Sequence, residues 1–114
     1  MLHTESITSR TLETLKQLMR DETLQDFFLV GDTALALYMG HRKSIDLDLF
    51  TLHSFDAPRM RAYLTDRYGL SNAFVRKDTV KGTIAEIKID CITYAYPLLE
   101  RVHEEGGIRL CSLR

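Results

Sequence analysis

The chain has 114 residues, of which 45% are hydrophobic and 27% are charged, and its formal net charge is -1 at pH 7. This is the composition of an ordinary globular protein, so we expect a single domain spanning residues 1–114. The near-neutral charge excludes a strongly basic nucleic-acid-binding protein. No apolar run approaches the roughly 18 residues that a membrane span needs, and no secretory signal is present, so we expect a cytoplasmic protein without a membrane partner.

The only two cysteines are Cys91 and Cys111, and they show neither a CxxC pair nor a metal-ligand spacing. Buried, reduced thiols are the expected state of such a pair in a cytosolic protein. A disulfide between them is the alternative.

The first half of the chain alternates between helical and strand patterns. Residues 9–22 carry leucines at three- and four-residue spacing, which predicts an amphipathic helix capped by Thr8 or Ser9. After it we expect, in order, an apolar strand at 27–30, a turn at Gly31, a helix at 33–39, a basic loop at 41–44 and a strand at 45–50.

The second half opens with another amphipathic helix at 57–68, where Pro58 suits the first turn and Gly69 the C-terminal stop. It is followed by a strand at 72–77, a turn at 78–82, a long strand at 83–94, a helix at 98–105, a glycine turn at 106–107 and a strand at 108–111. The predicted fold is α/β (α+β), a mixed sheet with helices packed on one side and the site at the strand 45–50 edge. A ferredoxin-like α+β sandwich is the alternative architecture.

Two carboxylates stand at alternate positions of the predicted strand 45–50. Side chains alternate across a strand, so Asp46 and Asp48 point to the same side, about 7 Å apart. Two like charges held side by side repel each other, and a divalent cation is the usual compensation. Carboxylate oxygens suit Mg²⁺ or Mn²⁺, which is therefore the expected cofactor.

The turn at Gly31 precedes a helix whose first N–H groups and positive dipole end can hold a phosphate. Thr33 adds a hydroxyl donor there. The alternative is ordinary N-capping by Asp32 or Thr33. In the loop at 41–44, Arg42 and Lys43 either contact phosphate and offset the acidic pair or form a solvated turn.

These motifs resemble those of a known family. Gly31-Asp32-Thr33, then Asp46-Leu47-Asp48, then a third aspartate in the strand-like run IKIDCITY are similar to the core of the DNA polymerase β nucleotidyltransferase superfamily. Within it, residues 28–50 most resemble toxin-type nucleotidyltransferases of the AbiEii kind. The resemblance implies a polymerase β-like core, with Asp46, Asp48 and Asp90 as the catalytic and metal-binding residues, and Gly31, Thr33, Arg42 and Lys43 as the nucleotide-binding residues.

The resemblance also implies a function: transfer of a nucleoside monophosphate from a nucleoside triphosphate to an RNA or protein acceptor. Members of the family often act as toxins beside an antitoxin, in toxin-antitoxin or abortive-infection systems. The family's domain continues into C-terminal helices that this sequence lacks, so we expect a minimal form or a fragment.

Asp32 departs from the family pattern, which has a second glycine at this position. It either points away and caps the helix or repels a triphosphate. Asp32 therefore favours an alternative function, a catalytically weak or inactive binding or regulatory module with the same fold. A third hypothesis is a structural α/β domain whose aspartates lie far apart on the surface.

Overall fold

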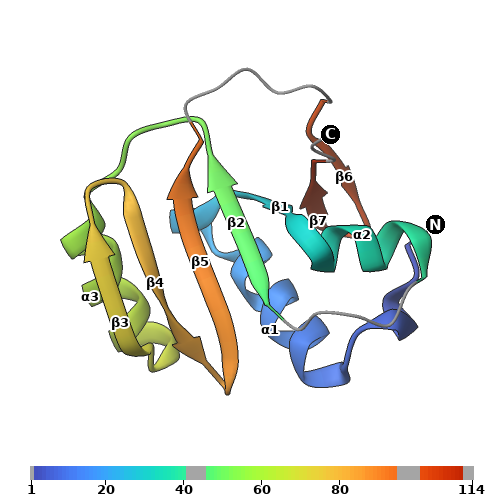
Figure 1. The fold of residues 1–114 in the computed structure, drawn as a ribbon, viewed down its shortest axis with the longest axis horizontal. Coiled ribbons are helices and arrows are strands. Elements are labelled where there is room, and N and C mark those ends of the chain that lie inside the picture. Colours follow the sequence, from blue (N-terminus) through green and yellow to red (C-terminus); the bar gives the residue numbers. More distant parts are fainter. Residues whose placement is uncertain (1, 41–45, 95–100, 112–114) are drawn as a thin grey trace.

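A mixed β-sheet runs through the protein, whose computed structural model describes residues 2–40, 46–94 and 101–111, apart from the side chains of Asp32, Tyr38 and Met39 (Figure 1). In the described ranges the sheet has seven strands in the order β3-β4-β5-β2-β1-β7-β6. The strands are β1 Phe28–Val30, β2 Leu47–Thr51, β3 Ser71–Arg76, β4 Thr79–Ile84, β5 Ile87–Thr93, β6 His103–Glu105 and β7 Ile108–Leu110.

The helices are α1 Ser9–Arg20, α2 Gly31–Met39 and α3 Ala57–Tyr68, with short 3-10 turns η1 Thr4–Ser6 and η2 Glu22–Leu24. Local sequence signals explain their ends. The Thr8 side chain accepts a hydrogen bond from the Thr11 N–H at the start of α1, and the Asp56 side chain accepts one from the Arg59 N–H at the start of α3. Gly69 ends α3 at φ 71, in the left-handed region that glycine occupies without strain.

All three helices contribute to one core cluster, which they share with inward-facing residues of the sheet. The burial pattern of β2 alternates, with Leu47, Leu49 and Thr51 buried and Asp48 and Phe50 half-buried between them. Figure 1 shows α1 and α3 behind the sheet. The opposite face carries Asp48 and Asp90, and beside them a second, smaller apolar cluster of Phe28, Val30 and Cys111.

Cys91 and Cys111 are both buried and reduced, which confirms the expected state. Burial, and secondly the charge of Asp90, raise the pKa of the Cys91 thiol to about 12. None of the helices within the described ranges has the length and apolar character that a bilayer crossing requires.

The predicted turn at 78–82 and single long strand at 83–94 are wrong. The chain forms a hairpin instead, in which β4 and β5 are joined by Ala85 and Glu86 at φ 51 and 68. Two left-handed residues suit a tight hairpin, but neither is the glycine or asparagine that usually marks one. Gly82, interpreted as a turn residue, lies inside β4, opposite Ile89, and a Cβ there would stand 2.6 Å from Leu70 Cδ1.

The predicted helix at 98–105 is also wrong where the structure describes it, since His103–Glu105 forms β6 and pairs antiparallel with β7. Its first residues lie outside the described ranges. The strand predicted at 45–50 is observed as Leu47–Thr51, and it is central rather than an edge, between β1 and β5. The seven-stranded order also differs from the β-α-β-β-α-β unit of the ferredoxin-like alternative.

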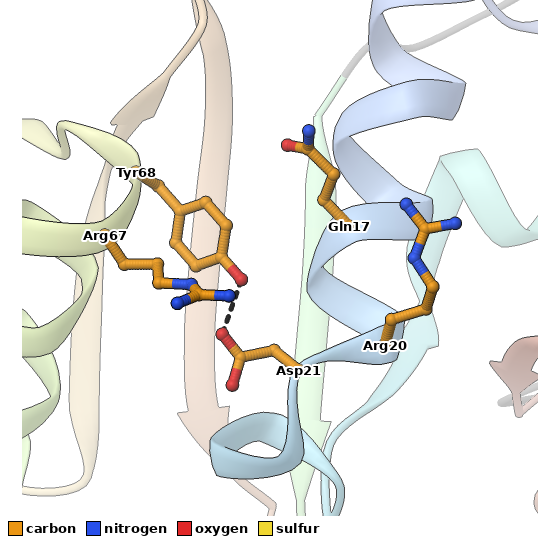
Figure 2. Close-up of a pocket in the computed structure, with 5 residues that line it drawn as sticks. All are labelled: Gln17, Arg20, Asp21, Arg67 and Tyr68. Carbon is orange, nitrogen blue, oxygen red and sulfur yellow. Dashed lines mark hydrogen bonds between the residues drawn. The ribbon is translucent and has the colours of Figure 1, made fainter.

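Asp21 links α1 to α3 through its carboxylate. It accepts hydrogen bonds from the Tyr63 hydroxyl at 2.6 Å, from the Tyr68 hydroxyl and from the Thr23 N–H at 2.9 Å. Asp21 and Tyr68 line a pocket of about 310 Å³. Figure 2 shows their side chains meeting there. Burial opposes the charge on Asp21, but these three donors and the nearby Arg67 outweigh it and hold the pKa of Asp21 below its usual value.

Arg109 of β7 ties together the segment that precedes β1. Its guanidinium donates to the carbonyls of Phe27 at 2.8 Å, Met19 at 3.0 Å and Leu24 at 3.0 Å. The planar, fork-shaped group of arginine can serve three acceptors at once. These bonds satisfy carbonyls at the end of α1 and in η2 that have no helical partner beyond them.

The Asp21 link predicts a pH-dependent stability. A lowered folded-state pKa contributes stability above the unfolded-state pKa of about 3.9 and loses it as the pH falls through the folded-state value. We expect Asp21→Asn to lower the free energy of unfolding by about 2 kcal/mol at pH 7, with the deficit shrinking below pH 4. Urea denaturation between pH 3 and pH 7 measures this. The exposed Asp66→Asn on α3 is the control, and a deficit that does not change with pH would contradict the link.

The three hydrogen bonds of the Arg109 guanidinium predict a large loss of stability when this residue is substituted. Arg109→Met should lower the free energy of unfolding by roughly 2–4 kcal/mol, because three charge-assisted hydrogen bonds disappear. Arg109→Lys should recover little of this, since one ammonium group cannot span three carbonyls. Arg61→Met, at an exposed position of α3, should change stability by less than about 0.5 kcal/mol. Equal urea midpoints for Arg109→Met and Arg61→Met would show that the Arg109 hydrogen bonds do not stabilise the fold.

Candidate active site

The site begins with two aspartates on neighbouring strands. Strand β2 pairs parallel with β5, and its register places Asp48 directly beside Asp90. Neighbouring strands lie about 4.8 Å apart, and directly paired residues point to the same face. Both aspartates are half-buried, while the residues on either side of each are buried in the core. The hypothesis of scattered surface aspartates therefore does not fit the structure.

Asp46 comes just before β2, two residues from Asp48, and α2 fixes its position. The Thr33 hydroxyl donates a hydrogen bond to the Asp46 carbonyl oxygen, and the Thr33 side chain is fully buried. Thr33 therefore ties the first turn of α2 to the acidic strand. The sequence had suggested a phosphate donor or a helix cap, whereas this hydroxyl is engaged with the backbone of Asp46.

Gly31 starts α2 against the Asp48 side chain. Its φ is 79, and a Cβ at this position would stand 2.3 Å from Asp48 Oδ2. Both the left-handed backbone and the close approach require glycine here. The turn predicted from sequence at Gly31 thus lies against Asp48, one member of the carboxylate pair.

The N-cap residue of α2 is Val30, which has no polar side chain, so the helix begins without a side-chain cap of its own. Thr33 is the third residue of α2 rather than its N-cap residue, and the described residues show no side-chain capping hydrogen bond. Asp32 lies in the first turn of α2, and its side chain is outside the described part of the structure. Arg42 and Lys43, predicted to bind nucleotide, also lie outside the described residues.

The pairing registers place five side chains in one row across the sheet. Val30, Asp48, Asp90, Lys81 and Phe74 are successive partners from β1 to β3. Lys81, an exposed residue opposite Asp90, was missed by the sequence analysis because residues 78–82 were assigned to a turn. The alternation of polar and apolar residues from 79 to 84 was the signal that could have identified it.

Lysines flank Asp90 on two sides. Lys81 is its cross-strand partner on β4, and Lys88 lies two residues earlier on β5, exposed on the same face. One row farther along, the rings of Phe50 and Tyr94 stack at 5.4 Å. The carboxylates therefore stand between cationic side chains and an aromatic pair.

The arrangement offers oxygen donors for a hard divalent cation. Within the described residues, however, no group of three or more His, Cys, Asp or Glu side chains is spaced to hold a metal ion by itself. Mg²⁺ is commonly held by one or two carboxylates together with water and substrate phosphates. A pair such as Asp48 and Asp90 fits that mode of binding better than it fits a closed protein cage.

Residues 13–110 match the family model of the nucleotidyl transferase AbiEii toxin, type IV toxin-antitoxin system. The chain belongs to this family. The match covers the Gly31 turn and both paired aspartates, so the AbiEii assignment and the site geometry concern the same part of the chain. The mixed sheet with its helices agrees with the nucleotidyltransferase-like fold expected from the sequence.

An uncharacterized protein of Aquifex aeolicus (strain VF5) is 33% identical to the chain over 98 residues, which cover 84% of this chain and 48% of that protein. The chain thus spans about half the length of the curated relative it matches. No solved structure gives a significant match.

The contact between Gly31 and Asp48 yields a stability prediction. Gly31→Ala and Gly69→Ala both place alanine at positive φ, which costs about 1–2 kcal/mol. Only the Gly31 substitution also drives a methyl group into a side chain, because nothing lies within 4 Å of the Gly69 position. We expect Gly31→Ala to be less stable than Gly69→Ala by roughly 1–3 kcal/mol.

Denaturation of the double variant tests the cause. In an Asp48→Ala background the extra cost of Gly31→Ala should disappear, because the obstructing carboxylate is gone. An extra cost that persists in that background would mean that Gly31 is constrained by something other than Asp48.

Proposed function

We propose that the chain is a metal-dependent nucleotidyltransferase that moves a nucleoside monophosphate from a nucleoside triphosphate to an acceptor hydroxyl and releases pyrophosphate. The observation that carries the proposal is the pairing of Asp48 with Asp90 beside the Gly31 turn. Membership of the AbiEii family supports this activity, and the type IV toxin-antitoxin description supports a toxin that works with an antitoxin. The acceptor is an RNA or protein hydroxyl.

Asp46, Asp48 and Asp90 would hold Mg²⁺ or Mn²⁺ in this proposal. When bound, such cations neutralise a polyphosphate and align the attacking and leaving oxygens for in-line transfer. Thr33 supports the arrangement by fixing the backbone of Asp46. The core residues on either side of the aspartates hold β2 and β5 in register, which pre-organises the two side chains.

The start of α2 would receive the β- and γ-phosphates. Unsatisfied N–H groups and the positive end of the helix dipole favour an anion there. Gly31 keeps the backbone accessible and in contact with Asp48. Arg42 and Lys43 remain proposed phosphate contacts.

Asp90 would orient the acceptor hydroxyl and accept its proton. A carboxylate within hydrogen-bond reach of the attacking group can act as general base. Lys81, beside Asp90, supplies positive charge where the phosphoryl oxygens gather during transfer. Lys88 can supply a second cation on the same face.

A second function is favoured by Asp32, which stands in the first turn of α2 where the family pattern has glycine. If its carboxylate faces the phosphates, repulsion at about 4 Å costs roughly 1–4 kcal/mol. The chain would then be a weak or inactive binding module. The measurement below separates the two functions.

Isothermal titration with each of the four ribonucleoside triphosphates in millimolar Mg²⁺ tests the proposal. We expect one or more triphosphates to bind, the heat to vanish when EDTA removes the cation, and Asp48→Asn and Asp90→Asn to weaken binding at least about tenfold. Asp66→Asn, on the exposed face of α3, is the matched control and should bind like the wild type. Transfer of label from an α-³²P triphosphate to cellular RNA or protein then reports catalysis.

Absence of binding for every triphosphate overturns the enzyme proposal. Metal-dependent binding without label transfer favours the binding module, and Asp32→Gly should then strengthen triphosphate binding. Equal loss of triphosphate affinity for Asp48→Asn and Asp66→Asn would show that the paired aspartates do not take part in triphosphate binding.

A further inference from the structure

We propose that Phe74, Arg76, Lys81 and Lys88 form a docking track for single-stranded nucleic acid, whose terminal hydroxyl is the acceptor. This inference rests on the proposed nucleotidyltransferase function and chooses between its two acceptor classes. We call these four residues the acceptor track. They come from β3, β4 and β5, at the opposite side of Asp90 from the Gly31 turn.

The strand registers place the acceptor track on the face of the sheet that carries the carboxylates. Phe74 pairs with Lys81, and Lys81 pairs with Asp90, so the three side chains point the same way. Arg76 lies two residues from Phe74 on the same side of β3. Two strand spacings separate Phe74 from Asp90, a distance of about 10 Å.

The acceptor track is open to solvent in the described part of the chain. Helix α3 packs against β3 and β4, and the buried residues of β4 that face this core, such as Val80, belong to the helix-covered cluster. On the other side Phe74 is 49% exposed, and Arg76, Lys81 and Lys88 are exposed. An aromatic ring on the edge strand, next to Arg76 and Lys81, is thus available to a partner.

The charge on this surface selects the partner. The outward positions of β3, β4 and β5 are Phe74, Arg76, Thr79, Lys81, Thr83, Lys88, Asp90 and Ile92. They include three cations and one anion, and that anion is the proposed catalytic carboxylate. The whole chain has a net charge of -1, so the positive character is local. A polyanion is the complementary partner.

The exposed ring of Phe74 favours single-stranded nucleic acid over a duplex. Single strands bind to grooves in which cations follow the backbone and bases stack on aromatic side chains. In a duplex the base faces are already stacked and cannot reach Phe74. A base on Phe74 and a phosphate beside Lys81 would direct the following nucleotide toward Asp90, where the proposed chemistry needs a hydroxyl.

Pairing of the β3 edge with a second copy of the chain is disfavoured. The β3–β4 register shifts between Ser71 and Phe74, and Asn72 adopts φ 52. Such irregularities interrupt the row of backbone groups that an added strand would need. The repulsion between clustered cations in two copies acts in the same direction.

Fluorescence anisotropy with a labelled single-stranded RNA of about 12 nucleotides, in EDTA and without triphosphate, tests the track separately from catalysis. We expect Phe74→Ala to weaken binding about 5- to 100-fold, whereas Phe74→Tyr retains binding because it keeps a π face. Leu35→Ala is the matched control, since Leu35 on α2 is 50% exposed and lies outside the track. Circular dichroism checks that each variant folds.

Salt dependence tests the cationic part of the track. Lys81→Gln should reduce the slope of log affinity against log salt by about one, because one phosphate contact is lost. Arg61→Gln, on α3 at the helix-covered side, should leave that slope unchanged. Equal slopes for these two variants would overturn the assignment of Lys81.

The other possible outcomes distinguish failure of the acceptor track from failure of the proposed enzyme function. No RNA binding by a wild type that binds triphosphate with Mg²⁺ overturns the track and leaves the proposed function standing. RNA binding that depends on Phe74, in a chain that binds no triphosphate, supports the track as a nucleic-acid surface and overturns the enzyme proposal. Equal affinity for a duplex of the same length, or self-association lost in Phe74→Ala, overturns the track.

Discussion

The parallel pairing of β2 with β5 is the constraint on which the site depends. It places Asp48 beside Asp90 on one face of the sheet and Leu49 beside Cys91 on the other. A slip of one residue would turn an aspartate into the apolar core and a leucine out to solvent. The burial that holds the sheet against its helices therefore also sets the spacing of the carboxylates.

A second constraint joins this pair to the start of α2. Gly31 approaches Asp48 too closely for any side chain, and Thr33 holds the backbone of Asp46. The start of α2 is consequently held against β2, which in turn is paired with β5. This arrangement agrees with membership of the AbiEii family, and it brings together the groups that a phosphoryl-transfer site needs: oxygen donors for a cation and backbone N–H groups for phosphate.

The two faces of the sheet have different physical roles. One face is closed by helices and tied at its margins by Asp21 and Arg109, whose hydrogen bonds join segments far apart in the sequence. The other face carries the carboxylates, with Lys81 and Phe74 beyond them toward the edge strand β3. The helix-covered face thus holds the main core, and the opposite face carries the residues of the proposed site.

Local patterns in the sequence determined the helices at 9–20 and 57–68, the turn at Gly31 and the alternation that separates Asp48 from the buried Leu47 and Leu49, because capping residues and side-chain periodicity act within a few residues. Tertiary structure alone decided that Asp90 lies beside Asp48 and that Lys81 lies beside Asp90, since strand register depends on partners distant in the chain. It also decided the hairpin at Ala85 and Glu86, where two ordinary residues adopt positive φ that nothing in their local sequence indicates. The sequence alone therefore indicated the carboxylate motif. The surface formed around it by Lys81 and its neighbours on β3, β4 and β5 depends on how the strands pair.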